Sequence, residues 1–485
     1  MNRSLFERSS GSLSPGGFAR LVTSRLLNTF QAAPGLRFDG GETGTAIRHE
    51  EDGPVAEADA ASSLWAHQTG VSALALEHFD GRILASGGLD ATIKLWNLEQ
   101  CANPSTGHTY TPVVSIRRSE QTHRFGITHL SFYPFDSGAF LSTSYDETLK
   151  VWATKTASLA ASFSLGSKVY THAISPIASH LLVACGTQHP AVRLVDLRSG
   201  ANVQSLAGHA GAVLAVSWSP RYEHVLASGS VDGTVKIWDI RRAGGPIGML
   251  DQEDSLGLYY NGLLDASTAK VRVRASAKAH TAPVNALTWT DDGGYIVSAG
   301  HDQRIRVWDA ATGRNTLASF GPSIRNRQLA SITPFTSPTG LARPGGELLF
   351  WPNETEILVL DLHDGHVVTR LRPTAPAVAS LRSSSSSTRS VRNRVTSLAW
   401  RGAGAGASET SSVGGAVMGG SNMAGAIFSA HLDGQIRAWV PRLEGDEDED
   451  EDEDGDDEAS RERAAKRKAL DDVYRGLTGR RITFV

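Results

Sequence analysis

Serine, histidine and aspartate recur at fixed spacings along this chain of 485 residues, and together they are the residue types of a hydrolytic triad. In five places a serine stands four residues before an aspartate and ten before a tryptophan. The five sets are Ser86, Asp90 and Trp96; Ser142, Asp146 and Trp152; Ser228, Asp232 and Trp238; Ser298, Asp302 and Trp308; and Ser429, Asp433 and Trp439. Four of the sets also have a histidine 22 or 23 residues before the aspartate, namely His67, His123, His209 and His280.

The same spacing can serve the fold, because a tryptophan placed inside a sheet must find an acceptor for its indole N–H. A serine hydroxyl can accept that bond, and a histidine ring can connect the hydroxyl to the aspartate. Five copies of one active site are implausible, and the chain has no Gly-x-Ser-x-Gly nucleophile elbow. We therefore predict that the five sets form a structural network, and we assign no catalytic residue, no metal ligand and no cofactor.

The elements that would position these residues are short strands. Apolar residues alternate with small or polar ones in 71–76, 127–132, 213–218, 284–289 and 395–400, as they do in half-buried strands. In each unit a second strand ends at the serine, the aspartate lies in a tight turn, and a third strand ends at the tryptophan. A fourth strand follows, as in 112–116 or 203–206. Four antiparallel strands form one blade of a β-propeller.

Two further units keep the spacing without its residues. The three positions hold Cys185, His189 and Val195 in one unit, and Phe350, Glu354 and Leu360 in the other. With these two the chain has seven units, which predicts an all-β, seven-bladed propeller over residues 58–442. We expect packing alone to hold the two degenerate blades, and we expect the insertions at 251–276, 321–345 and 401–423 to be loops.

Residues 1–57 precede the predicted propeller and contain one predicted helix. Hydrophobic residues recur close to one helical face between Pro15 and Pro34, with arginines elsewhere. They are Phe18, Leu21, Val22, Leu26 and Leu27. Such a helix can dock into the groove of a partner, or it can pack on its own propeller. If it docks, deletion of residues 1–36 lowers the affinity for the partner more than it lowers thermal stability.

Residues 443–485 form a charged tail. Twelve of the thirteen residues from Asp446 to Glu458 are acidic, so self-repulsion predicts a disordered segment. The net charge of the whole chain is −4, which leaves about +8 on the remainder and only weak evidence for contact with nucleic acid. The Lys466-Arg467-Lys468 stretch fits a nuclear import signal and a charge-balanced helix equally well.

Cysteine usage and hydropathy indicate the cellular compartment in which we expect the protein. The two cysteines, Cys101 and Cys185, cannot form a disulfide framework and have no zinc-type spacing around them. This favours a reducing, intracellular compartment. No apolar run approaches the length that spans a bilayer, so we expect no membrane partner.

Several segments resemble known repeats. Trp238-Asp239 and Trp308-Asp309 close two third strands as WD repeats do, and Gly208-His209 matches the companion dipeptide. Longer segments are more specific, because they closely resemble the Cockayne syndrome group A protein family. They are Tyr133–Gly138, Ser144–Trp152, Ala215–Tyr222 and Val235–Ala243. The resemblance is dense over residues 60–320 and looser over 346–442.

The resemblance implies a substrate receptor of a cullin-4 RING ubiquitin ligase. Such a receptor binds the large subunit of damage-specific DNA-binding protein as its adaptor, and through it cullin-4 and the RING subunit. The family acts in the nucleus, in transcription-coupled nucleotide excision repair at stalled RNA polymerase II, alongside the Cockayne group B translocase. The resemblance therefore implies a non-enzymatic monomer within a hetero-complex that needs no direct contact with nucleic acid.

Receptors of this class carry Trp-Asp-x-Arg at the end of a blade. Here Trp238-Asp239-Ile240-Arg241 is the one full copy. The resemblance implies that Asp239, Arg241 and Arg242 bind the adaptor, together with the helix over 18–27. An arginine beyond a strand can form charge-assisted bonds with a partner, or it can be an ordinary solvated side chain.

A histone- or chromatin-binding WD-repeat scaffold without ligase association is the alternative function. The acidic run and the N-terminal helix suggest it, and it does not require Arg241 to contact an adaptor. Co-purification of a cullin or of histones separates the two functions.

Overall fold

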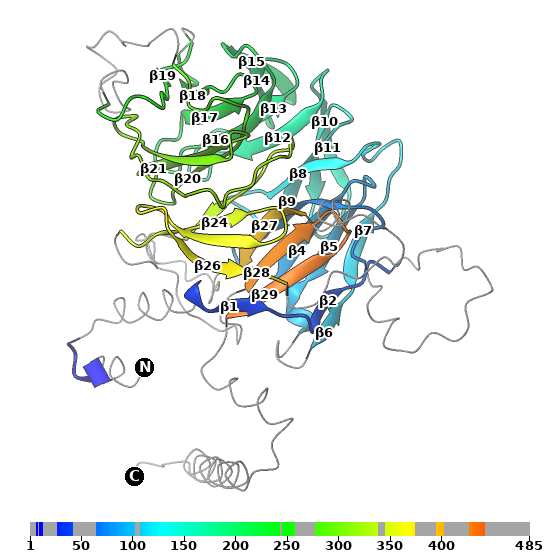
Figure 1. Cartoon of the computed structure of the whole chain (residues 1–485). Helices are drawn as coiled ribbons and strands as arrows, with labels where there is room; N and C mark the ends of the chain where they lie inside the picture. The colour runs from blue at the N-terminus through cyan, green and yellow to red at the C-terminus, as the bar shows by residue number, and fades with distance from the viewer. Residues whose placement is uncertain are drawn as a thin grey trace, which may run out of the picture. The chain divides into compact units, whose positions relative to one another are not determined.

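Each repeat unit forms its own antiparallel sheet, and the described part of the chain contains seven of these sheets (Figure 1). In this computed structural model the described residues are 6–7, 9–12, 27–41, 65–101, 107–242, 245–257, 277–337, 345–373, 394–401 and 426–441. Successive sheets pack against one another around a ring. The prediction of an all-β, seven-bladed propeller is confirmed.

Blades 1 to 4 have four strands each. Blade 1 contains β3 (Val71–Leu76), β4 (Ile83–Gly88), β5 (Ile93–Asn97) and β7 (Pro112–Ile116). Blade 2 contains β8 (Ile127–Phe132), β9 (Ala139–Ser144), β10 (Thr148–Ala153) and β11 (Leu159–Ser164). Blade 3 contains β12 (Val169–Ile174), β13 (Leu182–Thr187), β14 (Ala191–Asp196) and β15 (Ala201–Ala207). Blade 4 contains β16 (Val213–Trp218), β17 (Val225–Ser230), β18 (Val235–Asp239) and β19 (Gly248–Met249).

The later blades are less regular. Blade 5 contains β20 (Val284–Trp289), β21 (Tyr295–Gly300) and β22 (Arg304–Asp309). Blade 6 contains β23 (Phe335–Thr336), β24 (Leu348–Pro352), β25 (Ile357–Asp361) and β26 (Val367–Leu371). Blade 7 contains β27 (Val395–Arg401), β28 (Ala426–His431), β29 (Ile436–Pro441) and β1 (Phe30–Ala32). A parallel pair, β2 (Leu36–Phe38) with β6 (His108–Tyr110), and a short 3-10 helix, η2 (Leu98–Gln100), lie outside the seven sheets.

Small residues let neighbouring blades approach each other. Gly87 and Gly229 directly follow the network serines of blades 1 and 4. A Cβ on Gly87 would lie 2.6 Å from Cγ2 of Ile127, and a Cβ on Gly229 would lie 2.8 Å from Cγ1 of Val284. Ile127 and Val284 begin the next blades and are fully buried. The close-packed core therefore continues from one blade into the next.

The N-terminal part of the chain closes the ring. Strand β1 lies antiparallel beside β29, with Phe30 opposite Pro441, so blade 7 takes its outermost strand from near the other end of the chain (Figure 1). Leu27 and Phe30 are buried in a cluster that includes Trp439. The propeller thus begins well before residue 58, and the predicted boundary there is too late. The reason is that this three-residue strand carries none of the repeated serine, aspartate or tryptophan residues.

The parallel pair β2–β6 connects blade 1 to blade 7. The Phe38 ring stacks on Tyr110 with their centroids 4.8 Å apart. It also meets Trp96 of blade 1 and Phe428 of blade 7 edge-on, at 5.2 and 6.0 Å between centroids. Aromatic pairs of this kind contribute about 0.5–1.5 kcal/mol each beyond their burial. The N-terminal segment therefore stabilises the junction between the first and last blades.

The insertion at 321–345 differs from the loop that the sequence predicts. Ile324 and Ile332 are buried in the propeller, and residues 335–336 form the first strand of blade 6. The side-chain amide of Asn285 holds this segment, because its Nδ2 donates to the carbonyl oxygens of Gln328 and Ala330 at 2.7 and 3.1 Å. The sequence did not reveal this role, because the segment has no strand periodicity.

Several predictions fall outside the described residues. They concern Phe18, Leu21, Val22 and Leu26 of the N-terminal helix, the tail at 443–485, residues 258–276, and residues 402–423. Among the residues that are described, no helix has both the length and the hydropathy needed to cross a membrane.

Candidate partner-binding site

The structure joins serine, histidine and tryptophan into one hydrogen-bonded unit per regular blade. In blade 1 the Trp96 indole Nε1 donates to Ser86 Oγ at 2.9 Å, and His67 Nε2 lies 2.7 Å from the same oxygen. Both bonds recur in blades 2, 4 and 5 at 2.7–2.9 Å. All these serines are buried. Because each hydroxyl is held between two rings inside a blade, these sets position strands.

The aspartate end of the network takes two forms. In blade 2, as in blade 5, the histidine meets the carboxylate directly, with His123 Nδ1 2.8 Å from Asp146 Oδ2. In blade 1, as in blade 4, a threonine stands between them: Thr92 Oγ1 lies 2.7 Å from His67 Nδ1 and donates to Asp90 at 2.6 Å. Burial alone would raise the pKa of Asp90 and Asp146, but the hydrogen bonds and the histidine charge outweigh it and lower both to about 2. The carboxylates therefore stay ionised and hold the turns at neutral pH.

The fifth set takes its histidine from a position that the sequence analysis missed. Ser429 Oγ accepts from Trp439 Nε1 at 2.9 Å, and His431 Nε2 lies 2.9 Å from the same oxygen. His431 stands two residues after the serine, where blade 1 has Gly88. A Cβ on Gly88 would lie 2.6 Å from Nδ1 of the blade 1 histidine. The imidazole beside the serine can therefore come either from the upstream histidine, with glycine at this position, or from a histidine at this position itself. A histidine between the serine and the aspartate is the signal that could have revealed it.

Blades 3 and 6 have other side chains at the network positions. Cys185 and Val195 take the serine and tryptophan positions of blade 3 and are fully buried in an apolar cluster. Burial raises the pKa of the Cys185 thiol, so the thiol stays protonated and packs as a small apolar group. Phe350 and Leu360 of blade 6 are equally buried. Apolar packing thus replaces the hydrogen-bonded unit in these two blades.

Two histidines outside the network meet between blades 2 and 3. His129 of β8 and His172 of β12 face each other with their Nδ1 atoms 3.3 Å apart, and Ser131 Oγ lies 2.7 Å from His172 Nε2. Burial lowers the pKa of His129 to about 4. Burial also lowers the pKa of His172, and the neighbouring His129 lowers it further. Both rings are therefore neutral in the folded protein at pH 7.

We expect the free energy of unfolding to fall as the pH drops from about 7 to about 4. An unfolded histidine takes up a proton near pH 6.5, whereas His129 resists it down to about pH 4, so the unfolded state binds more protons across this window. By about pH 4, His129 alone lowers the free energy of unfolding by on the order of 3 kcal/mol. Burial lowers the pKa of His123, His209 and His280 as well, which acts in the same direction.

Urea unfolding at about pH 7, 6 and 5 measures this dependence. The substitution His129→Gln should flatten the slope, because it removes one group whose pKa differs between the two states. Stability that is constant or rises toward pH 5 would contradict the assignment of neutral buried rings.

The predicted adaptor site lies where β18 ends. Trp238 and Asp239 are both buried at this end of blade 4. Arg241 folds back onto Asp239: its Nε donates to Oδ1 at 3.0 Å, its Nη2 donates to Oδ2 at 2.8 Å, and its backbone N–H donates to Oδ1 at 3.0 Å. The Arg241 side chain remains 65% exposed. Asp239 therefore holds the guanidinium in one orientation and leaves it accessible to a partner.

Charged groups meet at this site. Burial would raise the pKa of Asp239, but the hydrogen bonds from Arg241 and the charges of Arg241 and Arg242 lower it. Arg242 Nε lies 4.0 Å from the same carboxylate. Two guanidinium groups thus share the Asp239 carboxylate, and the Glu223 carboxylate also acts on Arg241. Guanidinium groups bind carboxylates and carbonyl-lined surfaces with defined geometry.

The equivalent positions of other blades lack this arrangement. Three residues after the tryptophan, blade 1 has Glu99, blade 2 has Lys155 and blade 5 has Ala311. In blade 3 the carboxylate of Asp196 accepts the backbone N–H of Arg198 at 2.9 Å, and no bond to the Arg198 guanidinium is present among the residues described. The oriented arginine of blade 4 is therefore a departure from the repeat.

Of the predicted adaptor-binding helix, only Leu27 lies within the described residues. Its side chain is 3% exposed and packs with Phe30 in the cluster between blades 6 and 7. Leu27 belongs to the propeller core, and its assignment to the adaptor interface is corrected. The physical reason is that β1 begins three residues later and holds Leu27 against the sheet through its pairing with β29.

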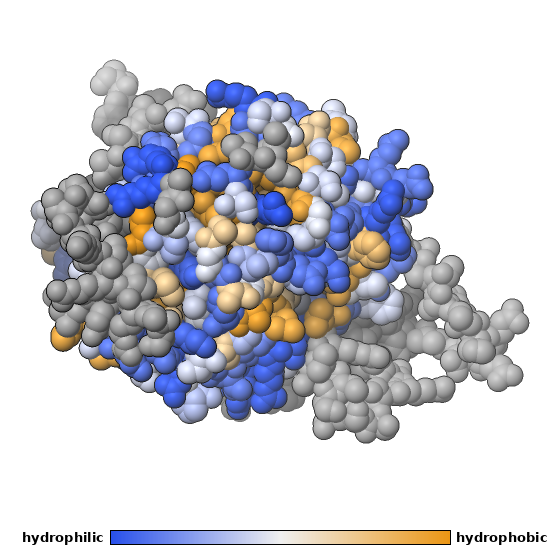
Figure 2. Space-filling model, turned by 90° about the horizontal axis from the view of Figure 1, so that it is seen from above, coloured by the Kyte–Doolittle hydropathy of each residue, from blue (hydrophilic) through white to orange (hydrophobic). Residues whose placement is uncertain are grey.

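Three exposed apolar residues lie at the opposite ends of the strands from Arg241, whereas others, such as Phe135 and Ile177, follow first strands at the same end. Leu89 and Val231 occupy the turns that precede β5 and β18, and Phe125 precedes β8. Figure 2 shows one face of the molecule, on which hydrophilic residues predominate and hydrophobic residues gather in separate patches. Contacts with a second partner at that end of the propeller would leave Arg241 accessible.

The fold and the repeated network define a WD-repeat propeller. The model of the WD domain, G-beta repeat, matches residues 60–97, 106–153, 200–239 and 272–309. These segments belong to blades 1, 2, 4 and 5, which are the blades with the upstream histidine.

The chain belongs to the family of the WD repeat-containing protein ATCSA-1 of Arabidopsis thaliana. The two are 33% identical over 311 residues, which cover 52% of this chain and 69% of the Arabidopsis protein. The chain is also similar to the ribosome biogenesis protein ytm1 of Aspergillus niger, at 27% identity over 50% of this chain and 53% of that protein. Radiation-sensitive protein 28 of Saccharomyces cerevisiae is 28% identical over 38% of each chain.

Proposed function

We propose that this protein is the substrate-recognition subunit of a cullin-4 RING ubiquitin ligase. In this proposal it belongs functionally with the Cockayne syndrome group A proteins and acts in transcription-coupled nucleotide excision repair at stalled RNA polymerase II. Similarity to ATCSA-1 and to a yeast protein named for radiation sensitivity supports the assignment.

One observation carries the proposal: Asp239 orients Arg241 at the end of blade 4. A guanidinium already held by its own carboxylate loses little conformational freedom on binding, and preorganisation of this kind favours affinity. The equivalent positions of blades 1, 2 and 5 hold Glu99, Lys155 and Ala311. Arginines do stand at this position in blades 3 and 7, as Arg198 and Arg442, but neither follows a Trp-Asp pair, so a partner that recognises the full motif would bind one blade in one orientation. That geometry suits an adaptor that must present the receptor at a fixed angle.

The remaining parts of the proposal follow from this role. The chain would act as a non-enzymatic monomer in the nucleus, bound to the large subunit of damage-specific DNA-binding protein and through it to cullin-4 and the RING subunit. RNA polymerase II and the Cockayne group B translocase would be its partners at the lesion. Residues 18–26, the predicted N-terminal helix, would add to the adaptor contact, with Asp239 and Arg242 supporting Arg241.

We expect Arg241→Glu to weaken adaptor binding by at least roughly tenfold, and Arg241→Ala to weaken it less. The charge reversal removes the guanidinium and also repels the buried carboxylate of Asp239. Biolayer interferometry with the purified adaptor subunit measures the two dissociation constants, and thermal unfolding checks that both variants remain folded.

Lys155→Glu is the matched control, because Lys155 holds the same position in blade 2 and is exposed. It should bind the adaptor as the wild type does. Equal binding by Arg241→Glu and Lys155→Glu would remove the support for this site. Recovery of histones or of pre-ribosomal proteins in place of the adaptor would favour a chromatin scaffold or a ribosome biogenesis role instead.

A further inference from the structure

Blade 5 lacks most of an outermost strand. Its sheet contains three strands, whereas the six other blades in the described part of the chain contain four. After β22 the chain pairs only briefly with that strand, through one bridge between Trp308 and Asn315. The bridge consists of two bonds, from Thr316 N to the Val307 carbonyl at 3.0 Å and from Asp309 N to the Arg314 carbonyl at 2.9 Å. It leaves the sheet edge at Leu317, whose φ is 61°.

Two sets of contacts divert the chain at this point. The Asn315 side chain donates to the Gln252 carbonyl and accepts from the Leu317 N–H, both at 3.0 Å, which closes a tight turn. Two residues later the backbone of Ser319 lies against Gly365 of blade 6, where a Cβ would come within 2.5 Å of the Ser319 carbonyl oxygen. Residues that could have extended blade 5 therefore pack on blade 6.

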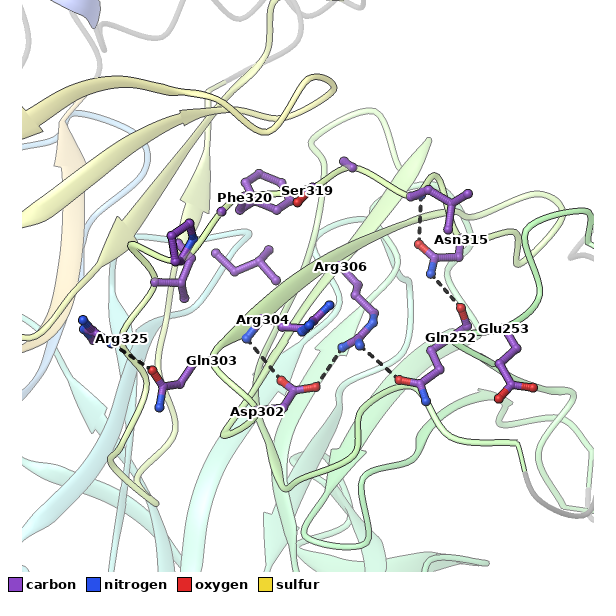
Figure 3. A pocket seen from close by; sticks show the side chains of 16 residues that line it. Gln252, Glu253, Asp302, Gln303, Arg304, Arg306, Asn315, Ser319, Phe320 and Arg325 are labelled. Atoms are coloured by element: carbon purple, nitrogen blue, oxygen red, sulfur yellow. Dashed lines mark hydrogen bonds and ion pairs between the residues drawn. The ribbon is translucent and has the colours of Figure 1, made fainter.

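A pocket of about 770 Å³ lies along the uncovered part of β22 (Figure 3). Ile305 lines it from the strand, Gln252 and Glu253 lie on one side, and Phe320 and Arg325 lie on the other (Figure 3). Its volume falls in the range of about 300–1,000 Å³ that is usual for ligand sites. The pocket thus occupies the place where other blades carry their fourth strand.

The open edge inside the pocket is the main chain of Ile305. The Val307 carbonyl accepts from Thr316 N on the outer side of β22. Alternate residues of an antiparallel strand direct their main-chain groups to the same side, so those of Ile305, two residues earlier, face this side as well. In blade 4 the equivalent residue, Val235, accepts from Leu250 N at 3.0 Å. No described residue makes the corresponding bond to Ile305. An unpaired strand edge is a template for the addition of another strand.

The arginines around this edge differ in how they are paired. Arg306 Nη1 donates to the Asp302 carboxylate at 2.9 Å, so that pair is neutral overall. Arg304 and Arg325 are exposed, and neither pairs with a carboxylate in the part of the chain that the structure describes. Glu253 is the one further acid that lines the pocket. The rim therefore carries an excess of positive charge.

We propose that this pocket binds an extended acidic peptide segment of a partner protein by strand addition. The main chain of the peptide pairs with Ile305 and completes blade 5, and an acidic side chain lies between Arg304 and Arg325. Strand addition to an exposed sheet edge is a recurrent mode of peptide recognition. Guanidinium groups favour carboxylates because they form two parallel bonds with them. The pocket shares no residue with the Arg241 site, so this proposal stands apart from the ligase function.

The test begins with a displayed library of random nine-residue peptides, selected on the purified full-length chain. We expect the enriched peptides to alternate apolar and acidic residues. A fluorescein-labelled enriched peptide should bind at least roughly tenfold more weakly to the R304E/R325E variant in fluorescence anisotropy. R314E, on the same blade but outside the pocket, is the matched control and should bind as the wild type does.

A second comparison tests the main-chain pairing. The same peptide, N-methylated at alternate amides on the edge that pairs, should lose at least roughly tenfold in affinity, because strand addition needs its N–H groups. Failure to enrich any peptide, or equal binding to wild type and R304E/R325E, overturns the proposal. Competition by a labelled oligonucleotide that also depends on Arg304 and Arg325 would assign the pocket to phosphate and overturn it too.

Discussion

Removal of residues 1–33 is expected to unfold blade 7, whereas removal of residues 1–26 should leave the stability of the propeller nearly unchanged. The longer deletion takes away Leu27 and Phe30, which are buried, and the whole of β1. Each such side chain stabilises the fold by about 1.5–3 kcal/mol. The deletion also leaves β29 as an open edge, and open edges promote aggregation. Thermal unfolding and size-exclusion chromatography of the two truncations measure the difference.

A point substitution separates the contribution of one side chain from that of the strand. Phe30→Ala should cost about 3–5 kcal/mol in urea unfolding, because Phe30 is buried and meets Phe350 edge-on at 6.3 Å. Phe6→Ala is the matched control, since Phe6 is 72% exposed and should change stability by no more than about 0.5 kcal/mol. If both truncations melted at the same temperature, β1 would not contribute to the stability of blade 7.

These truncations also refine the test of the N-terminal helix. A deletion of residues 1–36 removes a core strand together with the predicted helix, so it cannot separate adaptor affinity from stability. The deletion of residues 1–26 removes Phe18, Leu21, Val22 and Leu26 and keeps β1. It is therefore the variant on which adaptor binding should be measured.

Ser228→Ala is expected to destabilise the protein by about 2–6 kcal/mol. The Ser228 hydroxyl accepts from Trp238 Nε1 at 2.7 Å and lies 2.7 Å from His209 Nε2, so its removal leaves two buried polar groups without a partner. Each orphaned group costs about 1–3 kcal/mol. Urea unfolding measures the loss, and Ser137→Ala, at an exposed serine outside the network, should be nearly neutral.

A double-mutant cycle tests whether the serine and the tryptophan act as a unit. Trp238→Phe removes the indole N–H, so the further loss of Ser228 should cost less in that background than in the wild type. Costs that add without any coupling would argue against a shared hydrogen-bonded unit.

The sequence predicts the regular blades well because their signal is physical and repeated. The Ser228 and Trp238 positions specify an indole–hydroxyl bond, and that bond fixes the pairing of β17 with β18. The apolar Cys185 unit is recognisable for a related reason, since packing preserves the spacing when the polar residues are lost. Seven blades therefore follow from spacing alone.

Other features depend on contacts between residues distant in sequence, and spacing cannot reveal them. The pairing of Phe30 with Pro441 joins the two ends of the propeller, and nothing near Phe30 predicts it. The missing strand of blade 5 is equally hidden, because Asn315 and Thr316 begin as a fourth strand would. Only the contact of Asn315 with Gln252 shows why the chain turns away.

The prediction of Arg241 as an adaptor contact rests on spacing alone. The Trp-Asp-x-Arg spacing predicts this role for Arg241, but it does not show that Asp239 holds the guanidinium through two side-chain bonds. That arrangement depends on the buried position of Asp239 at the end of β18, which is a property of the folded blade.

Affinity purification of the tagged chain from ultraviolet-treated cells, with a proteasome inhibitor and quantitative mass spectrometry, tests the ligase assignment most directly. The adaptor subunit and cullin-4 should be recovered with the wild type and with Lys155→Glu, and they should be depleted with Arg241→Glu. Recovery of neither protein with the wild type, or equal recovery with Arg241→Glu, would contradict the account.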